Sequence, residues 1–383
     1  MAEIYKLENE IKKYAWGSTD MIPQLTGNSN PKKENWAELW MGIHPGGPSK
    51  TTVQGKTVPL SEITTLPFLF KFLAAENPLS IQTHPNTIQA QEGFERENKA
   101  GIPLSAAERN YRDPNHKPEI ICALSPFTAM AGFREKTETA ELLSMVKGTE
   151  HLQSAVKEGY LPFLSALFGL SETERIALND SVLKNKELSA KDLSPFTLCR
   201  KLAELYPNDP GIISPLYLNV INLKPFEAIF LPAGILHAYI HGFAMECMAN
   251  SDNVLRGGLT PKHIDVKELF SILCFDPYNP EILIPVRTAS LEYYSYTNLC
   301  REFSLYLLQN PLSSADPALP GGIEMEQPEN GIFAVYSGTA RINLQEKEIE
   351  LKSGESAFIS RRNKGESLRF FGDFTLFAAL APE

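Results

Sequence analysis

The most constraining feature of this sequence is an apolar stretch from Leu231 to Leu259 that is interrupted by an unusual variety of polar side chains. The polar residues that matter most within it are His237, Tyr239, His241, Glu246, Asp252 and Arg256. A polar group on a buried strand costs free energy unless it has a partner. A metal ion together with a polar ligand would supply such partners. The stretch therefore predicts a β fold that encloses a site.

The rest of the chain alternates between two patterns. Short apolar or aromatic runs, separated by glycine, proline and asparagine, occupy residues 1–133 and 207–284 and return in 285–383. Residues 134–206 instead have the apolar periodicity of helices. We therefore predict a mainly β fold with an α-helical insertion. The main domain is discontinuous (1–133 and 207–284), the helical insertion domain covers 134–206, and a C-terminal domain covers 285–383.

Three local signals predict individual helices. Asn86 is a typical N-cap and predicts a helix that continues through Lys99. The segment Ser171-Glu-Thr-Glu174 has the spacing of a capping box, in which the first and last side chains each bond the other's backbone N–H. Thr260-Pro261 predicts the start of a helix that runs to about Leu273.

A short internal repeat links two parts of the chain. The segment 224–232 matches 352–360 at a fixed offset of 128, with lysine, glutamate and phenylalanine in register. Repeated turns between short strands predict two related jelly-roll units. No histidine occurs after His263, so we expect the second unit to lack a histidine-based metal site and to have a structural role.

The composition of the chain indicates which partners it can bind and in which compartment it is found. The formal net charge of −10 argues against binding to nucleic acid, which depends on basic surfaces. No run approaches the roughly 18 apolar residues of a membrane span, and the first residues do not resemble a signal peptide. The five cysteines are scattered and predict reduced thiols. We expect a cytoplasmic protein with no membrane partner.

Four residues are candidate metal ligands. Gln82 and His84 lie two positions apart, so on a strand both side chains point to one face. Glu119 begins an apolar strand, an unusual place for an unpaired carboxylate, and His237 follows the turn that delivers another strand. Nitrogen and oxygen donors of this kind suit zinc or a similar divalent ion. The alternatives are a histidine that caps a strand end and a glutamate that faces solvent at a sheet edge.

Other charged residues are open to two interpretations. Lys71 lies among phenylalanines in the middle of a strand, and it either reaches the surface by its flexible stem or points inward toward an anion. Arg256 precedes two glycines and either contacts a ligand or lies in a solvated turn. His116 and Lys117 precede Pro118, which favours an extended backbone. His241 precedes Gly242 and either serves as a ligand or lies in a turn.

The sequence resembles the type I mannose-6-phosphate isomerases (phosphomannose isomerases), which are zinc enzymes of the cupin superfamily. The motifs that carry the resemblance are 14–18 (YAWGS), 37–44 (AELWMGIH), 78–85 (PLSIQTHP), 113–119 (DPNHKPE) and 231–265. They cover the β parts of the chain up to residue 265 in the order of the family. The resemblance implies two cupin units, the first catalytic and the second without a metal site.

The resemblance also implies roles for individual residues. The zinc ligands of the family correspond to Gln82, His84, Glu119 and His237. The catalytic residues correspond to Arg256, to Lys117 for proton transfer, to His116 for ring opening and to Asp252 as a rival base. The substrate-binding residues correspond to Lys71 and Ser80 at the phosphate end, and to Tyr239, Glu246 and Trp16 elsewhere in the pocket.

The implied activity is the interconversion of D-mannose 6-phosphate and D-fructose 6-phosphate by proton transfer through a cis-enediol, with one zinc ion per chain. The expected partner is a small phosphosugar, and the expected assembly is a monomer. Two other classes compete. A non-enzymatic sugar-binding cupin would leave the segment 115–119 unexplained. A cupin oxygenase would favour two histidines and one carboxylate on iron, and a glutamine ligand speaks against it.

Overall fold

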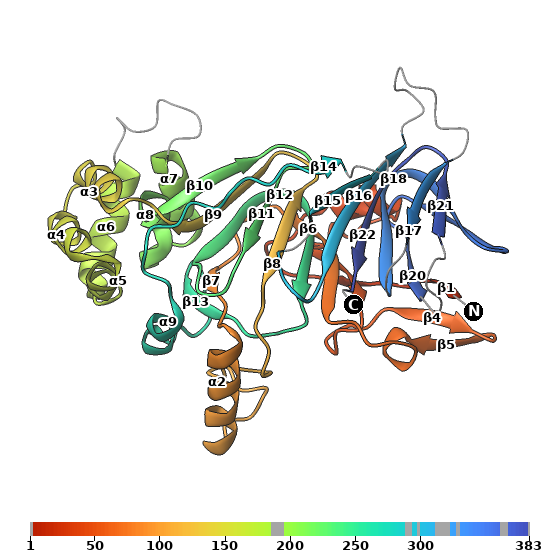
Figure 1. Ribbon diagram of the computed structural model, residues 1–383. Helices are drawn as coiled ribbons and strands as arrows, with labels where there is room; N and C mark the ends of the chain where they lie inside the picture. The colour runs from red at the N-terminus through yellow and green to blue at the C-terminus, as the bar shows by residue number, and fades with distance from the viewer. Residues whose placement is uncertain are drawn as a thin grey trace.

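The protein consists of two ten-stranded antiparallel sheets and a block of helices at one end (Figure 1). The computed structural model describes residues 3–184, 195–287, 293–296, 299–310, 322–326, 330–360 and 367–381. The mainly β fold with an α-helical insertion is confirmed. Within the described residues the strands form open, cupin-like sheets and not closed barrels.

The first sheet contains nearly all strands of the stretches 1–133 and 207–284. Its main path runs β10-β9-β12-β6-β3-β2, and β7, β8, β11 and β13 branch from it. These strands are β2 (Glu10–Lys12), β3 (Glu38–Gly42), β6 (Phe68–Ala75), β7 (Ile81–Thr83), β8 (Glu119–Ala123), β9 (Phe127–Phe133), β10 (Leu218–Leu223), β11 (Ala228–Leu231), β12 (His237–Ala249) and β13 (Leu255–Gly258). The long strand β12 pairs with β6, β7, β8 and β9, so it organises the sheet.

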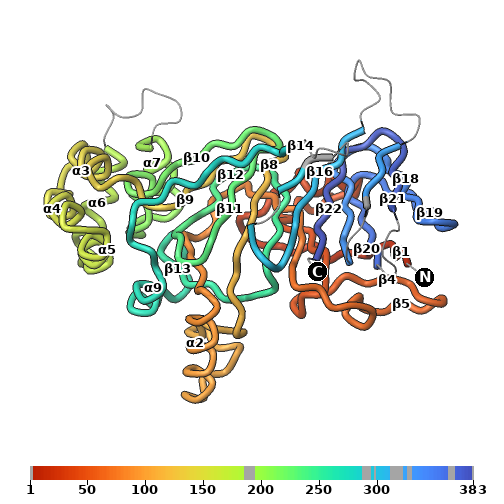
Figure 2. The backbone as a smooth tube through the Cα atoms, in the orientation of Figure 1, coloured from red at the N-terminus to blue at the C-terminus, as the bar shows by residue number. Residues whose placement is uncertain are grey.

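The second sheet contains the C-terminal strands together with the first strand of the chain. These strands are β1 (Glu3–Lys6), β14 (Val286–Arg287), β15 (Tyr293–Tyr296), β16 (Ser304–Asn310), β17 (Ile323–Glu326), β18 (Gly331–Leu344), β19 (Lys347–Lys352), β20 (Ser356–Ser360), β21 (Ser367–Phe371) and β22 (Phe374–Leu380). Because β1 pairs with β20, the N-terminus lies at the C-terminal sheet (Figure 2). A hairpin of β4 (Lys50–Val53) and β5 (Lys56–Pro59) lies beside it.

The two sheets share an apolar core. Ile120 and Cys122 of β8 belong to the same buried cluster as Phe303, Phe358 and Phe377 of the C-terminal part. Burial of apolar area contributes roughly 25 cal/mol per Å², so this shared cluster holds the sheets together. Strand β8 is consequently a wall between the first sheet's interior and the C-terminal sheet.

The internal repeat has the same local geometry in both copies. The Lys224 N–H donates to Glu227 Oε2 at 2.8 Å, and the Glu227 N–H donates to the Lys224 carbonyl at 3.0 Å. In the second copy, Lys352 and Glu355 make the same two bonds at 2.9 Å each. Each turn leads directly into a strand, β11 in the first sheet and β20 in the second. The repeat therefore marks equivalent turns in two related sheets.

The helices gather mainly at one end of the first sheet. They are α1 (Met21–Thr26), α2 (Thr87–Lys99), α3 (Lys136–Ser144), α4 (Glu150–Glu158), α5 (Tyr160–Phe168), α6 (Glu172–Lys184), α7 (Pro195–Leu205), α8 (Ser214–Tyr217) and α9 (Val266–Ile272), with short 3₁₀ turns η1 (Leu60–Glu62) and η2 (Pro210–Ile213). The predicted helical block therefore lies within 134–206. Figure 1 shows α2 projecting from the sheet by itself.

The helix signals were confirmed at two places and wrong at a third. Asn86 forms a capping box with Gln89 at the start of α2, and Ser171 accepts the Glu174 N–H at 3.3 Å before α6. The helix expected from Pro261 begins only at Val266. The reason is a stronger cap, because the Asp265 side chain accepts the Glu268 N–H at 3.0 Å.

No helix in the described part of the chain is long and apolar enough to cross a membrane.

Candidate metal centre and active site

The register of three strands brings the candidate metal ligands together. Strand β7 lies between β12 and β13, and Gln82 is directly opposite His237 on one side and Arg256 on the other. Residues directly opposite in an antiparallel pair share a face of the sheet. Glu119 begins β8 and is opposite Met248 of β12. Sequence positions up to 174 residues apart (Gln82 and Arg256) thus meet on one surface.

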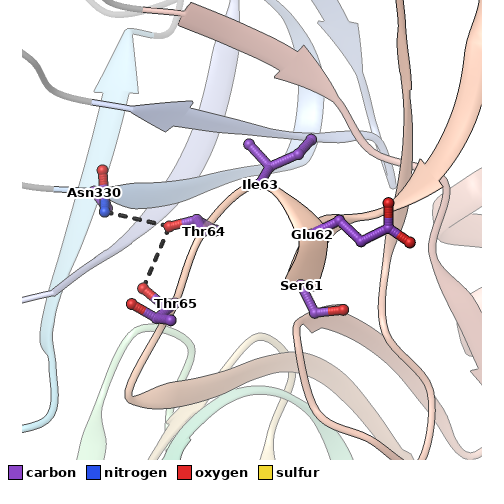
Figure 3. Close-up of a pocket in the computed structure, with 6 residues that line it drawn as sticks. All are labelled: Ser61, Glu62, Ile63, Thr64, Thr65 and Asn330. Carbon is purple, nitrogen blue, oxygen red and sulfur yellow. Dashed lines mark hydrogen bonds between the residues drawn. The ribbon is translucent and has the colours of Figure 1, made fainter.

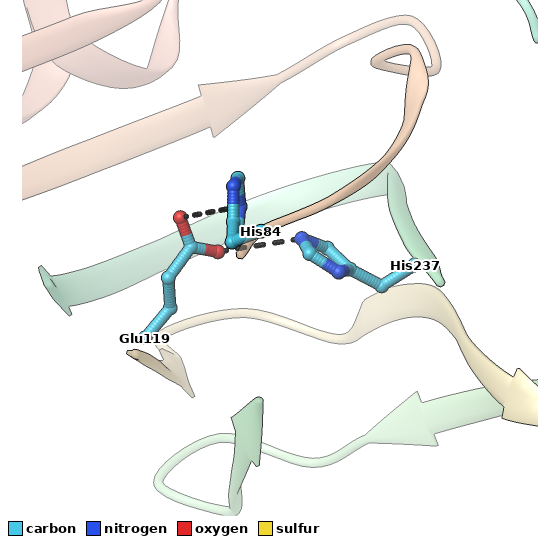
Figure 4. Close-up of side chains that lie close together, drawn as sticks. All are labelled: His84, Glu119 and His237. Atoms are coloured by element: carbon cyan, nitrogen blue, oxygen red, sulfur yellow. Dashed lines mark ion pairs between the residues drawn. The ribbon is translucent and has the colours of Figure 1, made fainter. Parts of the chain in front are cut away.

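His84, Glu119 and His237 form a compact buried cluster (Figure 4). One donor atom from each side chain lies within 4.8 Å of the others. The His84 Nε2 atom is 3.2 Å from Glu119 Oε1, and the His237 Nε2 atom is 3.4 Å from Glu119 Oε2. The Gln82 amide joins them, with its Nε2 atom 3.5 Å from His237 Nε2. All three members of the cluster are at most 2% exposed.

Hydrogen bonds behind the cluster fix how the two imidazoles are presented. His84 Nδ1 donates to the Asn253 carbonyl at 2.7 Å, and His237 Nδ1 donates to the Ile235 carbonyl at 2.9 Å. With Nδ1 carrying the hydrogen, a neutral ring presents a lone pair at Nε2. Burial, together with the nearby Lys117 ammonium, lowers the pKa of His84 to about 4. Neutral imidazoles oriented by such carbonyls are typical of metal ligands.

The donor set fits a zinc ion. His84 Nε2 is buried and makes no hydrogen bond of acceptable geometry within the described residues, although Glu119 is close. Burial alone would raise the pKa of Glu119, but Lys117 and His84 hold it well below its usual range. Lys117 compensates the charge of Glu119 but gives the buried His84 Nε2 atom no partner, and a metal ion would supply one. Zinc accepts nitrogen and oxygen donors of these types, and an amide turned about its last bond would offer Gln82 Oε1.

A chain of buried polar groups extends from the cluster into the sheet. The Lys117 Nζ atom is 3.0 Å from Glu119 Oε1. The Tyr239 hydroxyl lies 3.2 Å from Glu119 Oε2 and 3.0 Å from Glu246 Oε1. The Lys71 Nζ atom is in turn 2.6 Å from Glu246 Oε2. Polar groups so connected orient one another in a site of low dielectric.

The Lys71 side chain points inward toward anions and does not reach the surface, so the second of its two predicted positions is confirmed. It is 6% exposed and bonds Glu38 Oε1 at 3.0 Å as well as Glu246. Although burial opposes it, Glu246 and Glu38 raise the pKa of Lys71 above its usual value. One ammonium is shared by two carboxylates here. Burial and this excess of negative charge raise the pKa of Glu246. Glu38 is a buried partner of Lys71 that the sequence analysis did not single out, although it lies in the family motif 37–44.

A cluster of cations lies on the other side of the metal site. Burial lowers the pKa of Arg256 and of Lys262, and repulsion among Arg256, Arg112 and Lys262 lowers it further. Within the described residues none of these three side chains has an acidic partner. Unpaired cations that repel each other are typical of an anion site. Arg112 and Lys262 were also not singled out, although Lys262 lies within the motif 231–265 and Arg112 directly precedes the motif 113–119.

Comparisons with known proteins agree with this geometry. Residues 4–136 match the catalytic domain of type I phosphomannose isomerase. The mannose-6-phosphate isomerase of Salmonella typhimurium is 40% identical over 92% of this chain and 94% of its own length. The human mannose-6-phosphate isomerase is 32% identical over 76% of this chain and 78% of its own length. The chain belongs to the type I phosphomannose isomerase family.

Solved structures of this isomerase family match nearly the whole chain. The Salmonella typhimurium enzyme bound to fructose 6-phosphate and zinc superposes with a TM-score of 0.88 at 36% identity, covering 99% of this chain and 100% of that one. A zinc-bound mannose 6-phosphate isomerase superposes with a TM-score of 0.87, also at 36% identity and covering 99% of this chain. The family resemblance predicted from the motifs is therefore confirmed.

The remaining family positions lie around the cluster at varied depth. Ser80 is half-buried directly before β7, and Trp16 is half-buried and stacks on Tyr14 with ring centroids 5.5 Å apart. The Asp252 side chain is 53% exposed, and its Oδ1 atom is 3.5 Å from His44 Nε2. None of these three residues belongs to the buried cluster of His84, Glu119 and His237.

His241 is excluded from the cluster by a change of register. It lies in β12, not in a turn, but the pairing of β12 with β9 shifts between Tyr239 and His241. The shift turns the His241 side chain to the exposed surface, where Nδ1 contacts the Glu76 carbonyl at 3.2 Å. His241 is therefore neither a member of the metal cluster nor part of a turn, so neither of the two positions considered for it is seen.

A separate hollow of about 430 Å³ is not the isomerase site. Ser61 to Thr65 and Asn330 line it, at the junction of the two sheets (Figure 3). The Asn330 amide donates to Thr64 Oγ1 at 3.3 Å across it. None of the metal-cluster or cation-cluster residues is among its lining residues.

Proposed function

We propose that this chain interconverts D-mannose 6-phosphate and D-fructose 6-phosphate at a zinc ion held by Gln82, His84, Glu119 and His237. The observation that carries the proposal is the pair of histidines whose Nε2 atoms lie 3.2 and 3.4 Å from the two oxygens of one buried carboxylate. Support comes from a relative of similar fold whose structure holds zinc and fructose 6-phosphate. Zinc would polarise the sugar oxygens at C1 and C2 and so acidify the adjacent C–H.

The proton transfer between C1 and C2 would pass through a cis-enediol. Lys117 is the proposed base, and it can serve only in its neutral form. The Lys117 Nζ atom lies 3.0 Å from Glu119 Oε1, and this closeness to the metal cluster supports its assignment as the base. Asp252 is the rival base, because its exposed carboxylate is free to approach the substrate. Arg256, opposite Gln82, would stabilise the enediolate charge. His116, adjacent to Lys117, is the proposed residue for ring opening.

The charges around the site suggest how the substrate lies. The positive charge of Lys71 is matched by Glu38 and Glu246, whereas Arg112, Arg256 and Lys262 are unmatched. We therefore place the phosphate nearer these three cations. Lys71 then contributes hydrogen bonds to the sugar hydroxyls. The other proposed contacts to the sugar come from Ser80, Tyr239, Glu246 and Trp16.

Several properties of the whole protein belong to the same proposal. We retain the division into a catalytic domain (1–133 and 207–284), a helical insertion (134–206) and a C-terminal domain (285–383). The pairing of β1 with β20 ties the beginning of the catalytic domain to the C-terminal one. A cytoplasmic monomer without nucleic-acid or membrane partners would supply mannose 6-phosphate for GDP-mannose or pass mannose into glycolysis.

The direct test measures turnover of fructose 6-phosphate to mannose 6-phosphate by the purified protein, together with its zinc content. We expect turnover that a chelator abolishes and added zinc restores. His237→Ala should lose both bound zinc and turnover, whereas His241→Ala, which alters an exposed histidine of the same strand, should keep both. Turnover that survives complete removal of zinc would disprove the metal role, and a His237→Ala protein with full zinc would remove His237 from the ligands.

A further inference from the structure

The C-terminal part of the chain reaches the segment that carries Lys117 and Glu119 through one short contact. Glu302 lies two residues before β16, and its Oε1 atom is 2.6 Å from Nε2 of His116. The two side chains are 20% and 30% exposed, and 186 residues separate them in the sequence. A carboxylate bonded to an imidazole is a strong, directional partner, especially when the ring is protonated.

The alternation of β8 explains why this contact comes from the C-terminal sheet. Successive side chains of an extended segment point to opposite faces. Lys117 and Glu119 face the metal cluster, where their side chains meet at 3.0 Å. Ile120 and Cys122 face the other way and pack with Phe303, the residue after Glu302. His116 falls in the even-numbered set, and it meets Glu302 on the C-terminal side of the same wall.

We infer that Glu302 is a positioning residue of the active site: it holds His116 and thereby fixes the backbone that presents Lys117. This inference rests on the isomerase function proposed above. The C-terminal part of the chain contains no histidine. Through Glu302 it would nevertheless contribute to the reaction, by positioning His116. Among the described residues Glu302 contacts neither the metal cluster nor the cation cluster; its partners are His116 and the neighbouring Cys300, and His116 is the one that leads to the site.

The short covalent path makes such an effect large. Between His116 and Glu119 lie only Lys117 and Pro118, and proline fixes its own φ angle, so the segment transmits a shift instead of absorbing it. The Pro118 carbonyl is also tied to the Ala249 N–H at 3.1 Å. A displacement of about 1 Å at a reacting group can cost about 100-fold in rate. Loss of the anchor at His116 would allow Lys117 to move by such amounts.

The energetics of Glu302 also favour a functional reason for its presence. Its second oxygen, Oε2, is buried and accepts no hydrogen bond from any N–H or O–H group of the described residues. Leaving a buried acceptor unsatisfied costs about 1–3 kcal/mol. Stability alone would not favour a carboxylate here, and local costs of this kind cluster at functional sites.

The experiment compares Glu302→Ala, Glu302→Gln and His116→Ala with a matched control, Glu355→Ala. Glu355 directly precedes β20 of the C-terminal sheet and forms a 2.6 Å ion pair with Lys6, near the other end of the chain. Neither residue of this pair contacts a proposed metal ligand among the described ion pairs. For each protein, kcat, KM, zinc per chain and urea unfolding by tryptophan fluorescence are measured.

We expect Glu302→Ala to lower kcat by about 10–100-fold, the range found for groups that orient ligands, with zinc content and KM within about 2-fold of wild type. Glu302→Gln keeps an acceptor for His116. The decrease in log kcat that it causes should therefore be at most half of the decrease caused by Glu302→Ala. The double variant with His116→Ala should be no slower than His116→Ala alone, because the two changes break one interaction.

Three outcomes would overturn the inference: a Glu302→Ala kcat no lower than that of Glu355→Ala, a loss of activity that zinc depletion or unfolding accounts for, or fully additive effects of Glu302→Ala and His116→Ala. The wild-type assay separates this test from the proposed function. A wild-type chain with no isomerase turnover would contradict the function itself. A Glu302→Ala protein with the same kcat as Glu355→Ala would contradict only the role of Glu302.

Discussion

Replacement of Lys71 by methionine tests the buried charge network directly. Methionine keeps much of the length and apolar stem of lysine but removes the ammonium. Glu38 and Glu246, with side chains 7% and 2% exposed, would then be two buried carboxylates without the cation that both now contact at 3.0 and 2.6 Å. Breaking a buried ion pair from one side typically costs about 3–5 kcal/mol. We expect Lys71→Met to lose about that much free energy of unfolding at pH 7.5.

The pH dependence of the stability of Lys71→Met provides a second test of the same network. Burial and neighbouring carboxylates already raise the pKa of Glu246 in the folded protein, and loss of Lys71 removes the main opposing charge. A carboxyl whose folded pKa exceeds its unfolded value stabilises the fold below the unfolded pKa and loses that stabilisation as the pH rises. The deficit of Lys71→Met should therefore be small near pH 5 and grow toward pH 8, by up to about 1.4 kcal/mol per pH unit.

Urea unfolding followed by tryptophan fluorescence suits this measurement, because all three tryptophans lie between positions 16 and 40, in or next to the sheet that contains Lys71. The matched control is Lys6→Met, which breaks an exposed lysine–glutamate pair and should cost less than about 1 kcal/mol. Adding Glu246→Gln to Lys71→Met should recover part of the loss and flatten the pH dependence. A Lys71→Met protein as stable as wild type, or one whose deficit grows as the pH falls, would refute the reasoning.

Three further changes test other parts of the site and fold. Tyr239→Phe removes the hydroxyl between Glu119 and Glu246; we expect full zinc content and a kcat about 10–100-fold lower, and unchanged kinetics would contradict the network. Lys262→Ala should raise KM for the phosphosugar about 10-fold with little change in kcat, since it removes about one charge-assisted bond, whereas an unchanged KM would move the phosphate elsewhere. Gly93→Ala in α2 would place a Cβ 2.5 Å from the Tyr111 ring; thermal unfolding should show a loss of about 1–3 kcal/mol, and no loss would mean that the ring moves freely.

Some of the site follows from the local sequence. The two-residue spacing of Gln82 and His84 brought both side chains to His237. The same period put Lys117 and Glu119 on one face of their segment. The helix caps at Asn86 and Ser171 could also be predicted from the local sequence, because each side chain accepts a hydrogen bond from a backbone N–H only three residues away. Interactions of this range depend on backbone geometry that neighbouring residues largely determine.

Local reasoning failed where two valid signals competed or where the ladder changed register. Thr260-Pro261 is a plausible helix start, but Asp265 provides the cap that the structure uses. His241 has the same spacing from Tyr239 as Tyr239 has from His237, yet it faces solvent because the pairing with β9 shifts between them. A register shift depends on the partner strand, which a single strand's pattern does not contain.

By itself, the sequence determined the mainly β architecture with its helical insertion, the repeated turn at 224–227 and 352–355, and the residue types gathered at the metal cluster. Only the tertiary structure decided that Lys71 is shared by Glu38 and Glu246, that Arg112 and Lys262 join Arg256, and that Glu302 holds His116. The physical reason is distance along the chain. Periodicity fixes the face on which a side chain lies, whereas its partner depends on how strands pair and sheets pack. Those pairings join segments as far apart as Glu3 and Ser360, which 357 residues separate.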